Sequence, residues 1–390
     1  MSLNGKACIV GAYEHPTRFA PDKSVAQLHA ECASGALRDA GLSFADVDGF
    51  FCGGDIPGGG PLSMAEYLNL RLRYMDGTDL GGCSYLAHVA HATAAIAAGK
   101  CSVALITLAG KPRSSGQATG TMSFAYGADR PESVFETPYR WTLAAMYGNF
   151  ALRHMHEYGT TSEQLAWIKV AASHHAQHNP HALLRKVFTV DDVISSPMIA
   201  DPLHRLDCCV ITDGGGALIV ARPEIARSLA RPVVNIIGTG ETIKTNSGGN
   251  VSLTSTGAAV SGREAFAEAD VKPADIKYAS VYDAFTIMVL MQLEDLGFCE
   301  KGSGGRFVAD GNLISGVGRL PWNTDGGGLC SNHPADRGGM TKVIEAVRQL
   351  RGEAHPAVQV PNCDLALASG PGGILGAGQA HSTLILERAA

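Results

Sequence analysis

The sequence contains no apolar run that approaches the roughly 20 residues needed to span a bilayer. It also has no basic excess, because 37 acidic residues outnumber 31 basic residues and the formal net charge is −6. Nucleic acids and anionic membrane surfaces are bound through a cationic face. We therefore expect neither a nucleic acid nor a membrane as the main partner.

Paired cysteine motifs are absent as well. Ten cysteines are scattered over 390 residues without a CxxC pair, and a chain of this length builds its core without disulfides. Residues 1–13 show no basic region followed by the apolar core of a signal peptide. We expect a cytoplasmic protein with reduced thiols, one of which could act as a nucleophile.

The chain is rich in glycine, with 47 residues, and 45% of its residues are hydrophobic against 17% charged. This composition is typical of a compact folded protein, and the length fits about two domains. The glycines predict many tight turns and close backbone approaches.

Two parts of the chain repeat the same order of patterns. Each begins with a short apolar strand and continues with a helix that closes on a similar run. The matching pairs are residues 6–12 with 232–239, 25–42 with 262–271, 40–48 with 269–277, and 101–110 with 363–370. Alternating strand and helix patterns indicate crossover units and a mostly parallel sheet. The sequence therefore predicts an internal duplication of an α/β unit.

A segment of different character separates the two repeats. Residues 138–158 and 162–186 have helical periodicity and many histidines and aromatic residues, and strand character returns over residues 207–221. We expect an inserted helical lobe. The predicted domains are an N-terminal half at 1–112 plus 201–225, the lobe at 113–200, and a C-terminal half at 226–390.

Cys83 is the first candidate functional residue. It follows Gly81 and Gly82 and precedes an alanine-rich helical stretch. A cysteine at a helix N-terminus faces free N–H groups and the positive end of the helix dipole, which stabilise a thiolate and lower its pKa. The alternative is a small, inert core cysteine.

Two glycine-rich segments of the second half are further candidates. Residues 323–334 carry His333 ahead of a helical stretch, where its imidazole could activate Cys83, although a capping or core histidine is the alternative. Residues 370–373, Gly-Pro-Gly-Gly, end the last predicted core strand. The N–H groups of Gly372 and Gly373 could bind an oxyanion, with a plain turn as the alternative.

With these motifs the chain resembles the thiolase superfamily, nearest the sterol-carrier-protein-type and lipid-transfer-protein thiolases. The resemblance extends over nearly the whole chain. Cys83 and Gly99 are spaced as in the nucleophile motif of that group, residues 323–334 match its N-x-x-G-G…G-H-P motif in length, and Tyr282 opens a matching YDAF block. The resemblance implies an α/β fold in which duplicated βαβαβ halves form a five-layer α-β-α-β-α core with an inserted helical loop domain.

The resemblance also implies a mechanism for an acyl-CoA thiolase of fatty acid or steroid degradation. His333 would deprotonate Cys83, and the thiolate would attack the 3-keto carbon of a 3-oxoacyl-CoA. The N–H groups of Cys83, Gly372 and Gly373 would hold the oxyanion, and Tyr282 with His333 would hold the enolate. Cleavage would leave an acyl group on Cys83 that passes to a second CoA, and the same acyl-enzyme could serve Claisen-type bond formation. Coenzyme A would serve as a substrate, with no metal and no nucleotide cofactor.

Several positions depart from the thiolase pattern. Ser84, Tyr85 and Leu86 follow Cys83 where a small residue and a glycine are usual. Tyr282 stands where Asn or His is usual, Asn332 where glycine is usual, and Gly370 where many thiolases carry a second, acid/base cysteine. The related steroid side-chain retro-aldolases have no nucleophilic cysteine and rely on tyrosines. One alternative is therefore an acyl-CoA retro-aldolase that uses Tyr282, works with a small zinc-ribbon/OB-fold partner and leaves Cys83 a bystander. A third possibility is a non-catalytic acyl-CoA or lipid binder.

By the same resemblance we expect a homodimer or a dimer of dimers, assembled through the core sheet of the first half. CoA is expected to lie against the lobe at 113–200. Cations of this lobe could meet its phosphates, although none is assigned as a CoA-binding residue. They are Arg113, Arg130, Arg140, Arg153 and Lys169.

Overall fold

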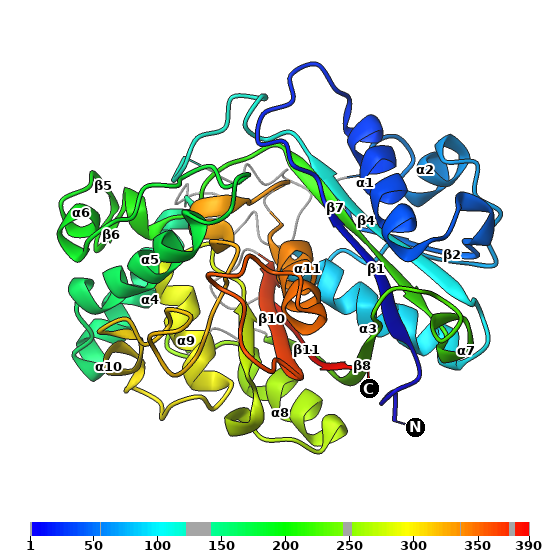
Figure 1. Ribbon diagram of the computed structural model, residues 1–390. Helices are drawn as coiled ribbons and strands as arrows, with labels where there is room; N and C mark the ends of the chain where they lie inside the picture. Colours follow the sequence, from blue (N-terminus) through cyan, green and yellow to red (C-terminus); the bar gives the residue numbers. More distant parts are fainter. Residues whose placement is uncertain are drawn as a thin grey trace.

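Two α/β halves share one sheet in this protein (Figure 1). The computed structural model describes residues 2–54, 56–121, 142–244, 252–335, 337–373 and 379–389. Within these residues the strand order is β3-β2-β4-β7-β1-β8-β11-β10-β9. The halves join where β1 pairs with β8 through Cys8–Asn235 and Ile9–Val234.

Both halves share a core order of strand, helix, strand, helix and two further strands, as the predicted duplication requires, and differ in the elements inserted before the second core helix. The first comprises β1 (Cys8–Glu14), α1 (Val25–Ala40), β2 (Gly49–Cys52), α2 (Pro61–Tyr67), β3 (Tyr74–Asp76), α3 (Ser84–Ala97), β4 (Val103–Gly110), β7 (Gly214–Ala221) and α7 (Pro223–Ala226). The second comprises β8 (Val234–Lys244), α8 (Ala258–Ala269), β9 (Tyr278–Val281), α9 (Thr286–Asp295), α10 (Gly304–Val308), α11 (Gly339–Arg351), β10 (Leu365–Gly373) and β11 (Gln379–Arg388).

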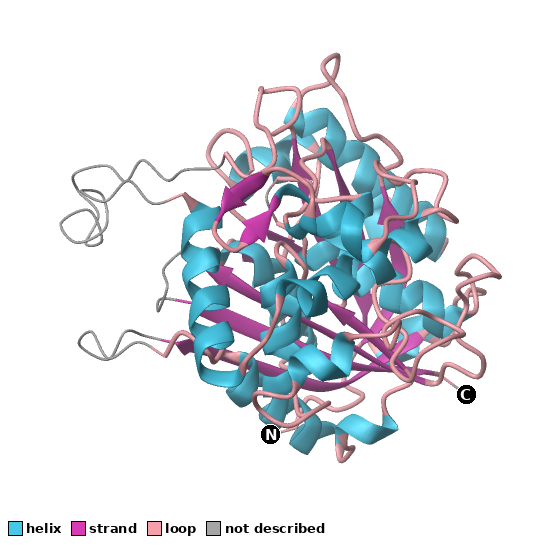
Figure 2. Ribbon diagram, turned by 90° about the vertical axis from the view of Figure 1, so that its left-hand side faces the viewer, coloured by secondary structure: helices cyan, strands magenta, loops and turns pink. Residues whose placement is uncertain are grey.

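The elements form five layers, which are helix α1, the strands of the first half, the central helices, the strands of the second half, and helix α8. Helix α1 covers one face of β1, β4 and β7, and α8 covers β8 and β11. Helices α3 and α11 contact each other and strands of both halves, so they form the central layer (Figure 1). Figure 2 shows the strands, in magenta, packed among helices, in cyan. The α-β-α-β-α architecture predicted from the sequence is confirmed.

A close helix–strand approach recurs in the two halves. A Cβ atom on Gly11 would lie 2.3 Å from the carbonyl oxygen of Ala36, and one on Gly238 would lie 2.2 Å from that of Ala265. Only glycine permits α1 to lie this close to β1, and α8 this close to β8. The duplication therefore extends to packing detail.

The sheet is mixed, whereas the sequence predicts a mostly parallel one. The crossover pairs β2–β4 and β9–β10 are parallel, but β7 and β11 run antiparallel to their neighbours. Strand β7 returns only after the inserted lobe. The few residues between Gly373 and Gln379 are fewer than the dozen or so that a parallel crossover needs, so β11 must turn back on β10.

The inserted lobe consists of α4 (Leu143–Tyr158), α5 (Ser162–Ala176), α6 (Val190–Ile194), β5 (Met198–Ala200) and β6 (Leu203–His204). Its helices α4 and α5 pack on α9. Helix α5 ends ten residues earlier than predicted, shortly before Pro180, because the residue preceding a proline disfavours helical backbone. Strand β7 begins at Gly214 and not at residue 207. Among the described residues no helix is both long and apolar enough to cross a membrane.

His91 links the central helix α3 to both halves. Its Nδ1 lies 2.8 Å from Oδ2 of Asp76 on β3, and its Nε2 lies 3.1 Å from Oε2 of Glu241 on β8. Hydrogen bonds to these carboxylates raise the pKa of His91 to about 9. Since the ordinary value is 6.5, the stabilisation is complete below that pH and is lost as the pH rises through about 9.

We expect His91→Gln to lower the free energy of unfolding by about 1–2 kcal/mol near pH 6, and by much less near pH 10. The difference arises because only the imidazolium attracts both carboxylates. Urea unfolding of the two proteins across this pH range measures the effect. A constant difference between the two stability curves would contradict it.

Candidate active site

Cys83 lies where the chain enters α3, at the end of the short helical turn η2 (Gly81–Cys83). Its side chain is fully buried, and its thiol lies 3.6 Å from the carbonyl oxygen of Leu80. Burial, reinforced by the charge of Glu241, raises the pKa of the thiol well above its ordinary value. This direction is opposite to the lowered pKa that the sequence suggests, because burial disfavours the charged thiolate.

Gly372 and Gly373 lie directly against the Cys83 segment. A Cβ atom on Gly372 would lie 2.8 Å from Sγ of Cys83, and one on Gly81 would lie 2.4 Å from the nitrogen of Gly373. Both glycines are the final residues of β10 and pair with β11. They belong to a strand, and β11 rather than β10 is the last strand of the core.

Tyr282 and His333 form a hydrogen-bonded pair. Tyr282 follows β9, and its hydroxyl lies 2.9 Å from Nε2 of His333. The same hydroxyl accepts a hydrogen bond of 3.0 Å from the N–H of Gly338, the N-cap residue of α11. A backbone donor at the positive end of a helix stabilises negative charge that develops on the phenol oxygen.

His333 is a neutral imidazole at physiological pH. It is only 3% exposed, and burial lowers its pKa to about 4 although the charge of Asp283 opposes this. A neutral ring can take a proton from the Tyr282 hydroxyl and return it. Within the described residues Nδ1 of His333 has no hydrogen-bond partner, so no carboxylate there holds the ring from behind.

Asp283 organises the backbone that precedes His333. Its carboxylate accepts hydrogen bonds from the N–H groups of Gly328 (2.9 Å) and Leu329 (3.1 Å) in the π-helical turn η8 (Gly327–Ser331). It also pairs with Nζ of Lys342 on α11 at 2.8 Å, and both side chains are 1% exposed. This buried ion pair ties the Tyr282 segment to α11.

Small residues surround the Tyr282 ring. A Cβ atom on Gly82 would lie 2.9 Å from the Tyr282 hydroxyl, one on Gly338 would lie 3.0 Å from Cε2, and one on Gly370 would lie 2.7 Å from its Cβ. Because Gly82 adjoins Cys83, the predicted site residues all meet at one place. Yet no hydrogen bond among the described residues joins Cys83 to His333, whose Nε2 pairs with Tyr282.

Known proteins of similar sequence and structure agree on one family. The family model described as thiolase C-terminal domain-like matches residues 240–388. A steroid side-chain-cleaving aldolase of Thermomonospora curvata is 36% identical over 90% of this chain and 91% of its own length. This chain belongs to the thiolase superfamily, in its sterol-carrier-protein type.

Two further similarities concern other members of the thiolase superfamily. An acetyl-CoA acetyltransferase of Methanothermobacter thermautotrophicus is 32% identical over 92% of this chain and 94% of its own length. A solved Ltp2–ChsH2 (DUF35) aldolase is 33% identical, with a TM-score of 0.86 over 99% of this chain and 98% of that one. Both aldolases and acyltransferases are thus similar to this chain over most of its length.

The cations expected to meet CoA in this thiolase-superfamily chain have other partners. Lys169 is fully buried and donates to the carbonyl oxygen of Leu329 at 2.5 Å, so it cannot reach a phosphate at the surface. Arg113 donates to the carbonyl oxygen of Arg18, and Arg153 pairs with Glu157 on its own helix. Arg130 and Arg140 lie outside the described residues.

Gly338 and Lys342 were not singled out from the sequence. Gly338 resembles any other glycine of the chain, and a lysine on a helix usually faces solvent. Asp283 could have been noticed, because it stands within the YDAF block beside Tyr282. Nothing in the sequence indicates that it pairs with a residue 59 positions away.

Proposed function

We propose that this protein is an acyl-CoA retro-aldolase, which cleaves the C2–C3 bond of a 3-hydroxyacyl-CoA with Tyr282 and His333 as its acid–base pair. The observation that supports this most directly is the hydrogen bond between the Tyr282 hydroxyl and Nε2 of His333. The N–H of Gly338 on the same oxygen adds the donor that a transient phenolate needs.

The proposed step conserves atoms and electrons. The Tyr282 oxygen takes the proton of the 3-hydroxyl while its own proton passes to Nε2 of His333. The electron pair of the C2–C3 bond moves to C2, so C3 leaves as a ketone or aldehyde and an acyl-CoA enolate forms. The proton then returns through Tyr282 to C2, which gives the shortened acyl-CoA and restores the pair.

Thiolytic cleavage through a Cys83 acyl-enzyme is the second candidate. The position of Cys83 against Gly372 and the similarity to an acetyltransferase favour it. It requires a thiolate, however, and burial raises the pKa of this thiol. Its base would also have to be His333, which is paired with Tyr282. We therefore rank retro-aldol chemistry first.

We further propose a substrate with a bulky polycyclic group, of the steroid side-chain type, by analogy with the aldolase of Thermomonospora curvata. The Ltp2–ChsH2 (DUF35) aldolase pairs a similar chain with a second protein. This supports a partner protein for the present chain, and by the resemblance to the retro-aldolases we propose that it is a small zinc-ribbon/OB-fold protein. A homodimeric assembly and a cytoplasmic location complete the proposal.

Cys83→Ala tests the proposal against the thiolase alternative. We expect its kcat/KM for 3-hydroxyacyl-CoA cleavage to stay within about three-fold of the unchanged protein, because no proposed proton passes through the thiol. Intact-mass spectrometry with 3-oxoacyl-CoAs would show no acyl adduct on either protein. An adduct that disappears only in Cys83→Ala would replace this proposal by thiolysis. Both assays are run with and without a zinc-ribbon/OB-fold partner.

A further inference from the structure

Asn332, which stands where thiolases usually have glycine, connects His333 to the first half of the chain. Its buried side chain donates from Nδ2 to Oε1 of Glu14 at 2.8 Å. Its Oδ1 accepts from the hydroxyl of Thr212 at 2.7 Å. The oxygen of Thr212 in turn accepts the backbone N–H of His333 at 2.9 Å.

Glu14 determines which group donates in each hydrogen bond of the series from Glu14 through Asn332 and Thr212 to His333. Burial alone would raise the pKa of Glu14, but the guanidinium groups of Arg18 and Arg348 lower it to about 2. Glu14 is therefore an ionised group that only accepts, so the NH₂ of Asn332 must face it. The amide oxygen of Asn332 then accepts the hydroxyl proton of Thr212. A lone pair of the Thr212 oxygen remains free to accept the backbone N–H of His333.

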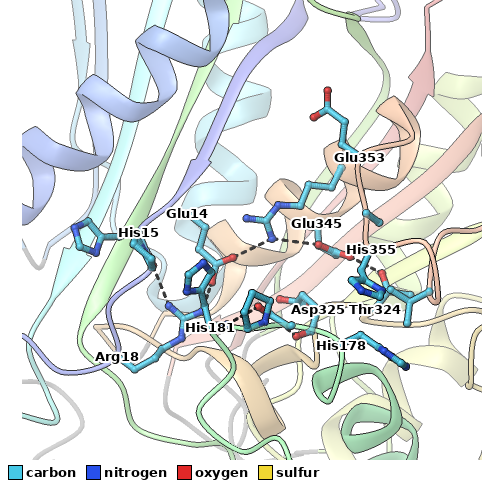
Figure 3. Close-up of a pocket in the computed structure, with 16 residues that line it drawn as sticks. Glu14, His15, Arg18, His178, His181, Thr324, Asp325, Glu345, Glu353 and His355 are labelled. Carbon is cyan, nitrogen blue, oxygen red and sulfur yellow. Dashed lines mark hydrogen bonds and ion pairs between the residues drawn. The ribbon is translucent and has the colours of Figure 1, made fainter.

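Arg18 holds the same segment at a second point. Its Nη2 pairs with Oε1 of Glu14 at 2.7 Å, and its Nε donates to the carbonyl oxygen of Ser331 at 3.0 Å. Glu14, Arg18 and Glu345 line one cavity of about 190 Å³ (Figure 3). Ser331 and Asn332 are thus held by side chains from the end of β1 and its following loop, whereas His333 is held by Thr212.

We propose that Asn332 and Thr212 are positioning residues for His333, which hold its backbone so that Nε2 stays within reach of the Tyr282 hydroxyl. This inference rests on the proposed function. Nδ1 of His333 has no partner among the described residues, so apart from the contact with Tyr282 the ring is placed by its backbone. A small misplacement of a proton-transfer group costs much of its rate.

Thr212→Val and Thr212→Ser form the matched test. We expect Thr212→Val to lower kcat about 10-fold or more with KM nearly unchanged, while Thr212→Ser, which keeps the hydroxyl, stays within about two-fold. Asn332→Gly is an independent variant with the same expected loss. In a Tyr282→Phe background, Thr212→Val should add less than about two-fold. A full additional loss in that background, or unchanged kcat in both variants, would overturn the proposal.

A measurement that does not depend on turnover separates this inference from the proposed function. In ¹⁵N-histidine NMR, the signals lost in His333→Gln identify the His333 ring. We expect Thr212→Val to shift these signals and Thr212→Ser to leave them in place. Unshifted signals in folded Thr212→Val would refute positioning. Shifted signals in a protein that cleaves no 3-hydroxyacyl-CoA would support positioning and refute the proposed function alone.

Discussion

Tyr282→Phe is expected to lower kcat/KM for carbon–carbon bond cleavage by about 10³-fold, since a positioned acid–base group contributes about 10²- to 10⁴-fold. The substitution removes the oxygen that faces both His333 and the N–H of Gly338. The ring is retained, so the packing of the surrounding glycines is preserved. Steady-state kinetics of acyl-CoA release measure the loss.

Tyr278→Phe is the matched control for this prediction. Tyr278 lies on β9 four positions before Tyr282, is fully buried, and accepts a bond of 3.3 Å from the N–H of Thr324. We expect Tyr278→Phe to lower the free energy of unfolding by about 1 kcal/mol and to leave kcat within about two-fold of the unchanged protein. Equal losses in the two variants would show that packing, and not proton transfer, explains the effect at Tyr282.

Lys342→Met is expected to destabilise the protein by about 3–5 kcal/mol, because it leaves the carboxylate of Asp283 buried without its cation. The pair is 2.8 Å long and both side chains are 1% exposed, so solvent cannot compensate. Urea unfolding followed by circular dichroism measures the loss. We also expect activity to fall, since Asp283 supports the turn that leads to His333.

Two comparisons make this stability prediction specific. Lys186→Met removes an ion pair with Asp192 in which the lysine is 66% exposed, and we expect it to cost less than about 1 kcal/mol. Combining Asp283→Asn with Lys342→Met removes both charges and should recover part of the loss. If Lys342→Met and Lys186→Met prove equally mild, the buried pair does not support the fold as argued.

The duplicated α/β architecture could be predicted because local patterns encode it. The repeated strand–helix order is visible in the chain itself, whereas the close packing of helices against Gly11 and Gly238 is seen only in the structure. The antiparallel course of β7 was not predictable, because it depends on where the inserted lobe returns the chain. Strand direction is a property of connection routes, which residue periodicity does not record.

The members of the candidate site could be found from sequence, but their pairing could not. Tyr282 and His333 are 51 positions apart, and either could have paired with Cys83. Tertiary packing places the Tyr282 hydroxyl against Nε2 of His333, and residue spacing does not record that placement. Lys169 was misplaced for the same reason, since only tertiary packing shows that its ammonium group is enclosed.

The crowding around Tyr282 also limits how this protein could change over evolution. A side chain at Gly370 would place its Cβ 2.7 Å from that of Tyr282 and 3.3 Å from a methyl carbon of Leu86. By the resemblance to thiolases, we expect position 370 to correspond to the second cysteine of a two-cysteine thiolase. That cysteine and the tyrosine in its present position therefore exclude each other. A cysteine introduced at position 370 would have to displace Tyr282, whose hydroxyl faces His333 and the N–H of Gly338.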